Sequence, residues 1–223
     1  MQQQLLLALL EAPPPTLDNF VPGANGAALA ALRGFGRDPG LMSLYFWGGH
    51  GSGRSHLLQA WCTIRQGAYI DARAQPNLAG ALQATALAID NCDALSDSGQ
   101  IALFNLYNQA RETGGLVLTS GPLPAAQLSL RDDLKSRLAW GLALEVKPLT
   151  DAEKQAALLG HAGARGMRLS DDIVAYMLVH VRRDMPTLMR LIDSLDNASL
   201  AAKRPVTLPL LRELLAESSS LPL

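Results

Sequence analysis

The chain has few of the residues that mark disulfide-bonded, metal-binding or membrane-spanning proteins. Its 223 residues include two cysteines, Cys62 and Cys92, both in apolar surroundings, so we expect reduced thiols in a cytosolic protein. The four histidines show no metal-site spacing. No apolar run reaches the length of about 20 residues that a membrane-spanning helix needs. The apolar stretch 5–10 has no basic flank, so we expect no signal peptide and no membrane partner.

An excess of either charge is also missing. Lys and Arg number 19 against 20 Asp and Glu, which gives a net charge of −1. This balance argues against a dedicated nucleic-acid surface, although a local basic patch remains compatible with it. Apolar residues make up 48% of the chain, enough for a sizeable core without disulfides or metals. We expect one domain of ordinary size and a smaller appendage.

A glycine-rich segment from Gly48 to Ser55 is the centre of the sequence. The aromatic-rich run 41–47 before it predicts a buried strand, and 56–62 after it predicts a helix. Strand, glycine loop and helix form the setting of a phosphate-binding loop. Gly48, Gly53 and Ser55 fit the pattern G-x-x-x-x-G-K-[ST], with Arg54 in the place of lysine. Arginine keeps the charge and presents it as a planar fork.

The chemistry of such a loop follows from its backbone. Glycines let the chain curl so that several N–H groups point at one anion, and the following helix adds its positive N-terminal end. Ser55 would supply a hydroxyl to a magnesium ion. We therefore expect a bound nucleotide, the alternative being a glycine-rich turn without a ligand.

A second buried strand, predicted over 85–91, ends in an acid. Asp90 would face the phosphate loop and orient magnesium or its water. Asn91 stands where many ATPases of this type place a glutamate, and an amide is a far poorer proton acceptor, so we expect slow intrinsic hydrolysis. Ser120 ends a further strand over 116–120. It is a candidate to polarise a γ-phosphate or water, or it is simply a serine at a strand end.

The remaining pattern up to Pro148 alternates strands and helices. Helices are predicted over about 26–37, 98–113 and 132–138, and strands over 68–71 and 142–146. Asn25 is the predicted cap of the first helix. Because a phosphate loop follows the first strand, residues 17–148 predict an α/β domain, a parallel sheet flanked by helices.

Beyond Pro148 the pattern is helical. Helices are predicted over 151–165, 170–181, 186–202 and 208–216, with Thr150 and Ser170 as caps and Pro186 at a helix start. We expect a small all-α lid domain over 149–217 and a frayed C-terminus over 218–223.

The first 16 residues form a separate tail. A glutamine-led aliphatic stretch over 2–10 precedes the stiff spacer Pro13–Pro15. The tail is either a docking peptide, whose aliphatic side chains fill a groove on a partner, or a terminus without a role.

With these parts in place, the chain resembles the AAA+ ATPases, and within them the DnaA initiator group and its Hda relatives. The resemblance runs from the tail to about residue 216 and is carried by 17–21, 53–58, 89–91, 104–108 and 134–141. Arg54, unusual in a phosphate loop, is similar to what Hda proteins carry. DnaA proteins continue into a helix-turn-helix domain, whereas this sequence stops before one, which favours the Hda relatives.

The resemblance implies a fold, ligands and partners. The fold would be an AAA+ domain followed by a helical lid, and the ligands ADP or ATP with Mg²⁺. The implied function is negative regulation of DNA replication initiation in the bacterial cytoplasm. Such proteins dock on the DNA-loaded sliding clamp, and so on the nucleoid, and stimulate hydrolysis of ATP bound to the DnaA initiator. DNA contact would be mainly indirect, through the clamp, and self-association is open.

The resemblance also assigns roles to individual residues. Arg137 matches the family's arginine finger, which acts in trans; a helix-surface salt bridge is the alternative. With Asp90 and Ser120 it would form the catalytic set, and Ser55 and Asp90 would hold magnesium. The clamp motif Q-L-x-L-x-L falls on Gln4, Leu5, Leu7 and Leu9. Nucleotide contacts fall on Phe20, Val21, Gly48, Gly51, Ser52, Gly53, Arg54, Ser55 and His56.

One family residue has no match. The sensor-2 arginine of the lid aligns with Pro186, which leaves Arg183 and Arg190 as candidates.

Two other functions fit the same motifs. The first is an adaptor that recruits DnaA or a helicase without promoting catalysis. The second is an autonomous AAA+ ATPase, which would need measurable hydrolysis by this chain alone.

Overall fold

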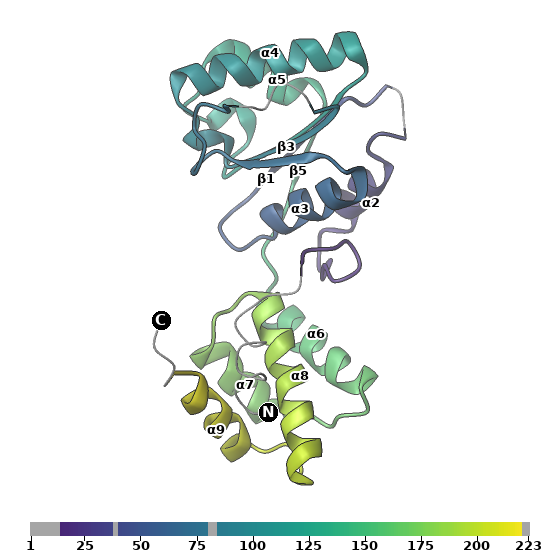
Figure 1. The fold of residues 1–223 in the computed structure, drawn as a ribbon, viewed down its shortest axis with the longest axis vertical. Coiled ribbons are helices and arrows are strands. Elements are labelled where there is room, and N and C mark those ends of the chain that lie inside the picture. Colours follow the sequence, from purple (N-terminus) through teal and green to yellow (C-terminus); the bar gives the residue numbers. More distant parts are fainter. Residues whose placement is uncertain (1–13, 38–39, 80–83, 220–223) are drawn as a thin grey trace. The chain divides into compact units, whose positions relative to one another are not determined.

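The computed structural model describes residues 14–37, 40–79 and 84–219. The described residues form two compact units, an α/β unit over 14–148 and a helical unit over 149–219. Figure 1 draws the α/β unit in purple to teal and the helical unit in green to yellow. The predicted docking tail, Gln4 to Leu9, lies outside the described residues.

A five-stranded parallel sheet forms the centre of the α/β unit, in the order β2-β3-β4-β1-β5. The strands are β1 (Ser43–Trp47), β2 (Ala68–Asp71), β3 (Ala86–Asp90), β4 (Leu116–Gly121) and β5 (Leu142–Glu145). The helices of this unit are α2 (Gly26–Gly34), α3 (Arg54–Arg65), α4 (Asp97–Thr113) and α5 (Asp132–Trp140). Two short 3₁₀ turns, Cys92–Ala94 and Ala125–Gln127, complete it.

Helices cover both faces of this sheet, which confirms the predicted α/β architecture. In Figure 1, α2 and α3 lie on one face and α4 and α5 on the other. Successive side chains of a strand point to opposite faces. In β3, Leu87 and Ile89 pack in the core under α4 and α5, whereas Ala86 and Ala88 pack against α2 and α3. Every residue of β3 is therefore buried, as expected for a strand inside a doubly covered parallel sheet.

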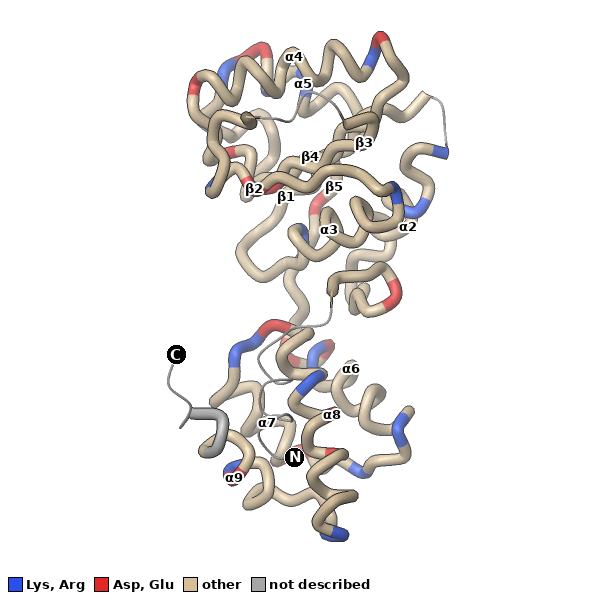
Figure 2. Tube along the Cα trace, viewed as in Figure 1, with Lys and Arg blue, Asp and Glu red and all other residues tan. Residues whose placement is uncertain are grey.

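Charged residues mark the ends of the strands. In Figure 2 the strands are almost entirely tan, with acidic residues where β2, β3 and β5 end. Because the strands are parallel, the ends of β1, β3 and β4 meet at one edge of the sheet. At that edge the backbone N–H of Gly48 donates to the carbonyl of Gly121, 3.2 Å away. The edge therefore gathers the glycine loop and the polar residues that follow the strands.

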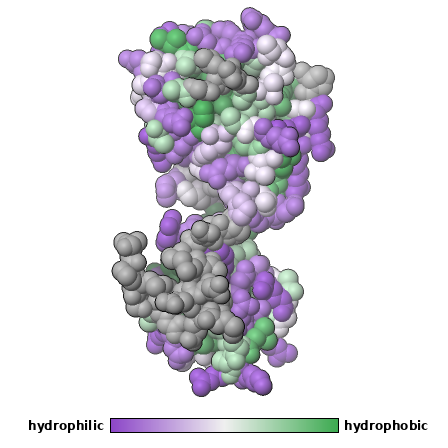
Figure 3. Space-filling model, in the orientation of Figure 1, coloured by the Kyte–Doolittle hydropathy of each residue, from purple (hydrophilic) through white to green (hydrophobic). Residues whose placement is uncertain are grey.

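The surface of the α/β unit has no single large apolar face in the view of Figure 3, where hydrophilic residues surround small apolar patches. Exposed large apolar side chains are nevertheless present, and Trp140, which ends α5, is 51% exposed.

The second unit contains four helices among its described residues: α6 (Asp151–Ala164), α7 (Asp171–His180), α8 (Met185–Ala202) and α9 (Leu208–Ser219). Their apolar faces share one core that includes Leu158, Ile192 and Leu211. These bounds agree with the predicted helices within a few residues. No helix of the described chain is long and apolar enough to cross a membrane.

The helix starts of the second unit were predicted with mixed success. Thr150 forms a full capping box with Glu153, whose carboxylate accepts the Thr150 N–H at 2.8 Å. Pro186 lies in the first turn of α8, as predicted. Ser170 occupies the cap position of α7 without a side-chain bond to the helix backbone, so its predicted capping role is wrong.

The predicted capping role of Asn25 is also wrong, because its side chain is used elsewhere. Asn25 precedes α2 but makes no cap bond. Its Nδ2 donates to the carbonyl of Lys147 at 2.8 Å, and its Oδ1 accepts the Lys147 N–H at 2.7 Å. Asn25 is 3% exposed, so both bonds are shielded from water. The amide thus pairs like a strand residue with the backbone that follows β5.

This pairing requires a donor and an acceptor on one side chain. Asn25→Asp keeps capping ability but loses the donor. We expect it to lower the free energy of unfolding by about 2 kcal/mol, because a buried carbonyl loses its partner. Urea unfolding followed by tryptophan fluorescence measures this, since Trp47, Trp61 and Trp140 all lie in the α/β unit. Unchanged stability of Asn25→Asp would restore the capping interpretation.

Candidate functional site

The glycine loop joins β1 to α3, and two of its glycines are required by close contacts. A Cβ at Gly48 would lie 2.1 Å from the carbonyl oxygen of Val146. Gly53 has φ +95°, and a Cβ there would lie 2.8 Å from the Phe20 ring. Gly51 also has positive φ, +75°. Only glycine fits such positions without strain, so the curled backbone is built into the sequence.

The start of α3 is open to an anion. Gly53 is the residue before its first turn, no side chain caps the helix, and no acidic residue lies in that turn. The first N–H groups of a helix need partners from outside the helix, and together with the helix dipole they favour negative charge. Ser55 is exposed in this first turn.

Two buried polar side chains of the loop lack partners. Arg54 is 8% exposed and Ser52 is 6% exposed. The Nε and Nη1 atoms of Arg54 and the Oγ of Ser52 have no hydrogen-bond partner within the described part of the chain. Burying an unpaired charge is costly, so these atoms fit an anionic ligand. A phosphate group is suited to them, because each carries an N–H or O–H that phosphate oxygens can accept.

The segment before α2 packs against the start of α3. The Phe20 and His56 rings lie 5.5 Å apart, and His56 Nε2 lies 2.8 Å from the carbonyl oxygen of Thr16. Burial lowers the pKa of His56, although the bond to Thr16 opposes that shift. Val21 is half-buried in the same segment. The structure therefore brings Phe20 and His56, both predicted from the sequence, to the glycine loop.

At the end of β3, Asp90 is held by two neighbouring strands. The carboxylate is 1% exposed. Its Oδ1 accepts the Asn91 N–H at 3.0 Å and a short bond from the Ser120 hydroxyl of β4. Its Oδ2 accepts the Tyr69 hydroxyl of β2 at 2.9 Å. Ser120 was predicted as a group for phosphate or water, but here its proton is directed to Asp90.

Asn91 turns toward β2. Its Nδ2 donates to Asp71 Oδ1 at 2.9 Å, and its own φ of +54° lies in the left-handed region. An amide in this position offers no carboxylate base to an attacking water.

Sequence reasoning missed Tyr69 and Asp71. Both lie on β2, which pairs in parallel with β3 so that Asp71 is in register with Asp90. The sequence did contain a signal for Asp71. The carboxyl ends of parallel strands meet at one edge of the sheet, and Asp71 ends the strand 68–71 as Asp90 ends the strand 86–90. What the sequence did not give was the reach of the Tyr69 side chain to the end of the neighbouring strand.

The described residues offer no ready-made metal cage, since no group of three His, Cys, Asp or Glu could hold an ion by itself. Magnesium at phosphate sites takes one or two protein groups and completes its shell with phosphate oxygens and water. Ser55 and Asp90 fit that pattern. They would hold magnesium only together with a phosphate ligand that supplies further oxygens.

The two cysteines are free and buried, as expected of core residues. Burial raises the pKa of Cys62 to about 11 and raises that of Cys92 further. Both thiols therefore stay protonated and unreactive near neutral pH.

Arg137 lies on α5 and rests on aromatic rings. Its Cζ is 5.2 Å from the Phe104 ring centroid and 5.4 Å from that of Trp140. Arg111 of α4 lies over the same Trp140 ring at 5.7 Å. The alternative of a surface salt bridge for Arg137 is not what the structure shows, since no carboxylate among the described residues pairs with it. A shallow groove of about 490 Å³ beside it is lined by Phe104, Asp133, Ser136, Arg137 and Trp140.

The candidate sensor residues all belong to the helical unit. Arg183 forms an ion pair with Asp151 at 2.6 Å. Arg190 donates from Nε to the Pro186 carbonyl at 3.4 Å. Pro186 itself has no side-chain donor for a phosphate.

Comparison with known proteins finds similar proteins for both units. Residues 151–215 match the family model described as "Hda, lid domain". Domain III of the replication initiation protein DnaA from Thermotoga maritima is similar over 95% of this chain and all of its own, with a TM-score of 0.65 and 22% identity. DnaA from Aquifex aeolicus bound to AMPPCP is similar over 82% of this chain and 65% of its own, with a TM-score of 0.60 and 20% identity.

A third structure has the same fold. A point mutant of RuvB from Thermotoga maritima is similar over 93% of this chain and 73% of its own, at a TM-score of 0.61 and 17% identity. At these identities the DnaA and RuvB structures show that the fold is shared, a parallel sheet flanked by helices and followed by a helical domain. The match to Hda covers the lid, residues 151–215.

The candidate site residues fall into two groups within the α/β unit. The glycine loop, Phe20, His56, Asp90 and Ser120 gather around the edge where the strands end. Arg137 belongs instead to the surface where α5 packs beside α4, in contact with Phe104 and Trp140. An arginine placed there is suited to contact a ligand other than one bound at the glycine loop of the same chain.

The lowered pKa of His56 predicts a pH dependence of stability. The unfolded chain, with a histidine pKa of about 6.5, takes up a proton more readily than the folded chain. The stability that neutral His56 contributes to the fold is thus fully present above the unfolded-state pKa and is lost as the pH falls below it. We expect the thermal midpoint to fall less steeply between pH 7 and pH 5 in His56→Gln, whose amide can still donate to Thr16.

Thermal unfolding followed by tryptophan fluorescence checks this. His50→Gln, on the exposed part of the loop, is the matched control. Identical pH profiles for the wild type and His56→Gln would contradict the assignment.

Proposed function

We propose that this protein is a nucleotide-bound regulator that stimulates hydrolysis of ATP held by the DnaA initiator. In this proposal it binds ADP with Mg²⁺ at the glycine loop and docks on the DNA-loaded sliding clamp through its tail. Arg137 then reaches the γ-phosphate of the DnaA-bound nucleotide. The protein thereby limits replication initiation, in the cytoplasm and at the nucleoid.

Nucleotide binding is supported by the loop itself. The uncapped start of α3 and the unpartnered atoms of Arg54 and Ser52 call for an anion at one point. Two of the similar DnaA structures contain AMPPCP, an ATP analogue. Gly48, Gly51 and Gly53 give the backbone its curl, and Ser55 with Asp90 would hold magnesium on the phosphates.

Retention of the nucleotide without turnover is supported by the strand ends. The Asn91 amide is bonded to Asp71 and the Ser120 hydroxyl to Asp90. Neither group is left to activate a water or to polarise a γ-phosphate in this arrangement. We therefore propose weak or no intrinsic ATPase activity, with the product nucleotide, ADP, as the resident ligand.

The observation that carries the proposal is the setting of Arg137. A half-buried guanidinium held on two rings, with no carboxylate partner among the described residues, keeps its full charge for an outside anion. Cation–π contacts are worth about 0.5–1 kcal/mol at exposed sites, so the guanidinium can leave them for a phosphate at small cost. An arginine finger supplied in trans works by offsetting transition-state charge at such a phosphate.

The decisive measurement is hydrolysis of labelled ATP preloaded on DnaA, with and without DNA-loaded clamp. Arg137→Ala should retain nucleotide and clamp binding and lose about 10³-fold or more of the stimulated rate, within the range known for arginine fingers. Arg137→Lys should recover little, because an ammonium lacks the planar fork.

Arg111→Ala is the matched control, since Arg111 also lies over Trp140 but carries no catalytic role in the proposal. Full stimulation by Arg137→Ala would refute the finger. Complex formation with clamp and DnaA but no ATP hydrolysis by the wild type would leave an adaptor. Hydrolysis by this chain alone, abolished by Asp90→Asn, would identify an autonomous ATPase.

Clamp docking is proposed for Gln4, Leu5, Leu7 and Leu9. In such a peptide the aliphatic side chains fill a groove and the glutamine amide fixes the register. Replacing Gln4 and Leu5 together by alanine should abolish capture of the protein by immobilised clamp, while nucleotide affinity stays unchanged because the glycine loop is intact. The matched control is Gln2→Ala with Leu10→Ala, outside the motif. Capture at wild-type levels by the Gln4/Leu5 variant would exclude this docking peptide.

A further inference from the structure

The acid at the end of β3 depends on a side chain from the neighbouring strand β2. The Tyr69 hydroxyl donates to Asp90 Oδ2 at 2.9 Å, while Oδ1 is held by the Asn91 N–H and the Ser120 hydroxyl. Both carboxylate oxygens therefore have a donor. The plane of the carboxylate is fixed from two sides, by β2 and by β4.

The register of the sheet explains why Tyr69 reaches this position. Asp71 is opposite Asp90 in the parallel pair, and Tyr69 is opposite Ala88. Residues two apart on a strand share a face, so Tyr69, Asp71 and Asp90 all lie on one face of the sheet. Tyr69 packs against the core under α3 on that face, and α3 is the helix whose first turn follows the glycine loop.

Tyr69 is the donor in this contact, because a carboxylate oxygen can only accept a hydrogen bond.

We propose that Tyr69 is the positioning residue of the magnesium site: its hydroxyl fixes Asp90 in the orientation that receives a nucleotide-bound Mg²⁺ ion or one of its waters. This inference rests on the proposed nucleotide binding and goes beyond it, because Tyr69 is assigned no contact with the loop or the phosphates and acts only through Asp90. A carboxylate has about four lone-pair sites, so Asp90 can accept from Tyr69, Ser120 and the Asn91 N–H and still offer one site on Oδ2 to an ion.

The physical basis is the loss of metal affinity when a coordinating side chain is free to rotate. Groups that hydrogen-bond a metal ligand fix its orientation, and their loss typically weakens metal affinity about 10- to 100-fold. Mg²⁺ demands nearly ideal octahedral geometry, so it is sensitive to a carboxylate that can rotate. Without the Tyr69 hydroxyl, Oδ2 of Asp90 would lose its only donor among the described residues.

Tyr69→Phe tests the proposal, because it removes one oxygen and keeps the ring. The affinity of the full chain for a fluorescent ADP is measured in EDTA and over a series of Mg²⁺ concentrations. We expect the Mg²⁺ concentration that gives half of the affinity gain to rise about tenfold in Tyr69→Phe. The affinity in EDTA should stay at the wild-type value, since the loop and Arg54 are untouched.

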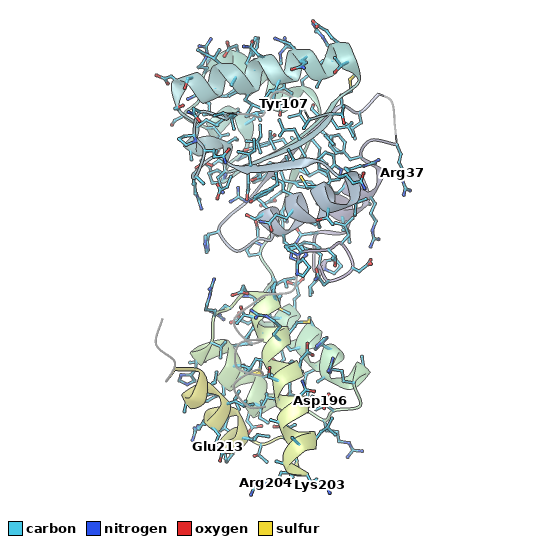
Figure 4. The ribbon with its side chains drawn as sticks, in the orientation of Figure 1. Arg37, Tyr107, Asp196, Lys203, Arg204 and Glu213 are labelled. Atoms are coloured by element: carbon cyan, nitrogen blue, oxygen red, sulfur yellow. The ribbon has the colours of Figure 1, made fainter. Side chains whose placement is uncertain are left out.

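Tyr107→Phe is the matched control. Tyr107 projects from α4 toward the sheet in Figure 4, and its buried hydroxyl bonds to Thr119 at 3.0 Å, on the face of the sheet away from α3. It should leave the Mg²⁺ series unchanged.

Three results would overturn the proposal. An identical Mg²⁺ series for Tyr69→Phe and the wild type would refute the positioning role alone. An equal loss of affinity with and without Mg²⁺ would reduce Tyr69 to a structural residue. No binding of ADP by the wild type in either condition would refute the proposed function itself, and the inference with it.

Discussion

Parallel pairing of β1, β3 and β4 is the constraint on which the candidate site depends. Three segments that are far apart in the sequence end at the same edge of the sheet because their strands run in one direction. The glycine loop, Asp90 and Ser120 meet there without any local sequence signal that joins them. An antiparallel partner in the middle would send one of these groups to the opposite edge. The site is thus a property of the topology, and the side chains only decide its chemistry.

The parts that could be predicted from sequence are those whose cause is local. The glycine loop, the buried strands and the capping box at Thr150 are readable because spacing and residue type act within a few positions. Asn25 was misassigned because an asparagine before a helix is compatible with capping, and its true partner lies 122 residues away. Tyr69 was missed for the same reason, since its contact depends on strand register.

The loop also illustrates how a ligand site opposes stability. An enclosed guanidinium without a carboxylate would be selected against in an ordinary core, where buried charges are paired. Arg54 is in this costly state at the start of α3, next to glycines whose conformation no other residue adopts without strain. Arg165, by contrast, is paired within the fold with Asp193 and Asp196. The contrast separates residues that stabilise the fold from residues that we propose hold a ligand.

The position of β1 between β4 and β5 has a consequence for how the chain acquires its structure. The partners of β1 are β4 and β5, both of which leave the ribosome long after it. Until residue 145 is available, the aromatic-rich strand 43–47 lacks at least one of its two neighbours and exposes an unpaired edge. Such non-local pairing slows folding and prolongs exposure to aggregation. The same arrangement that assembles the site therefore leaves the aromatic-rich strand β1 open to wrong pairing until the last strand of the sheet has been made.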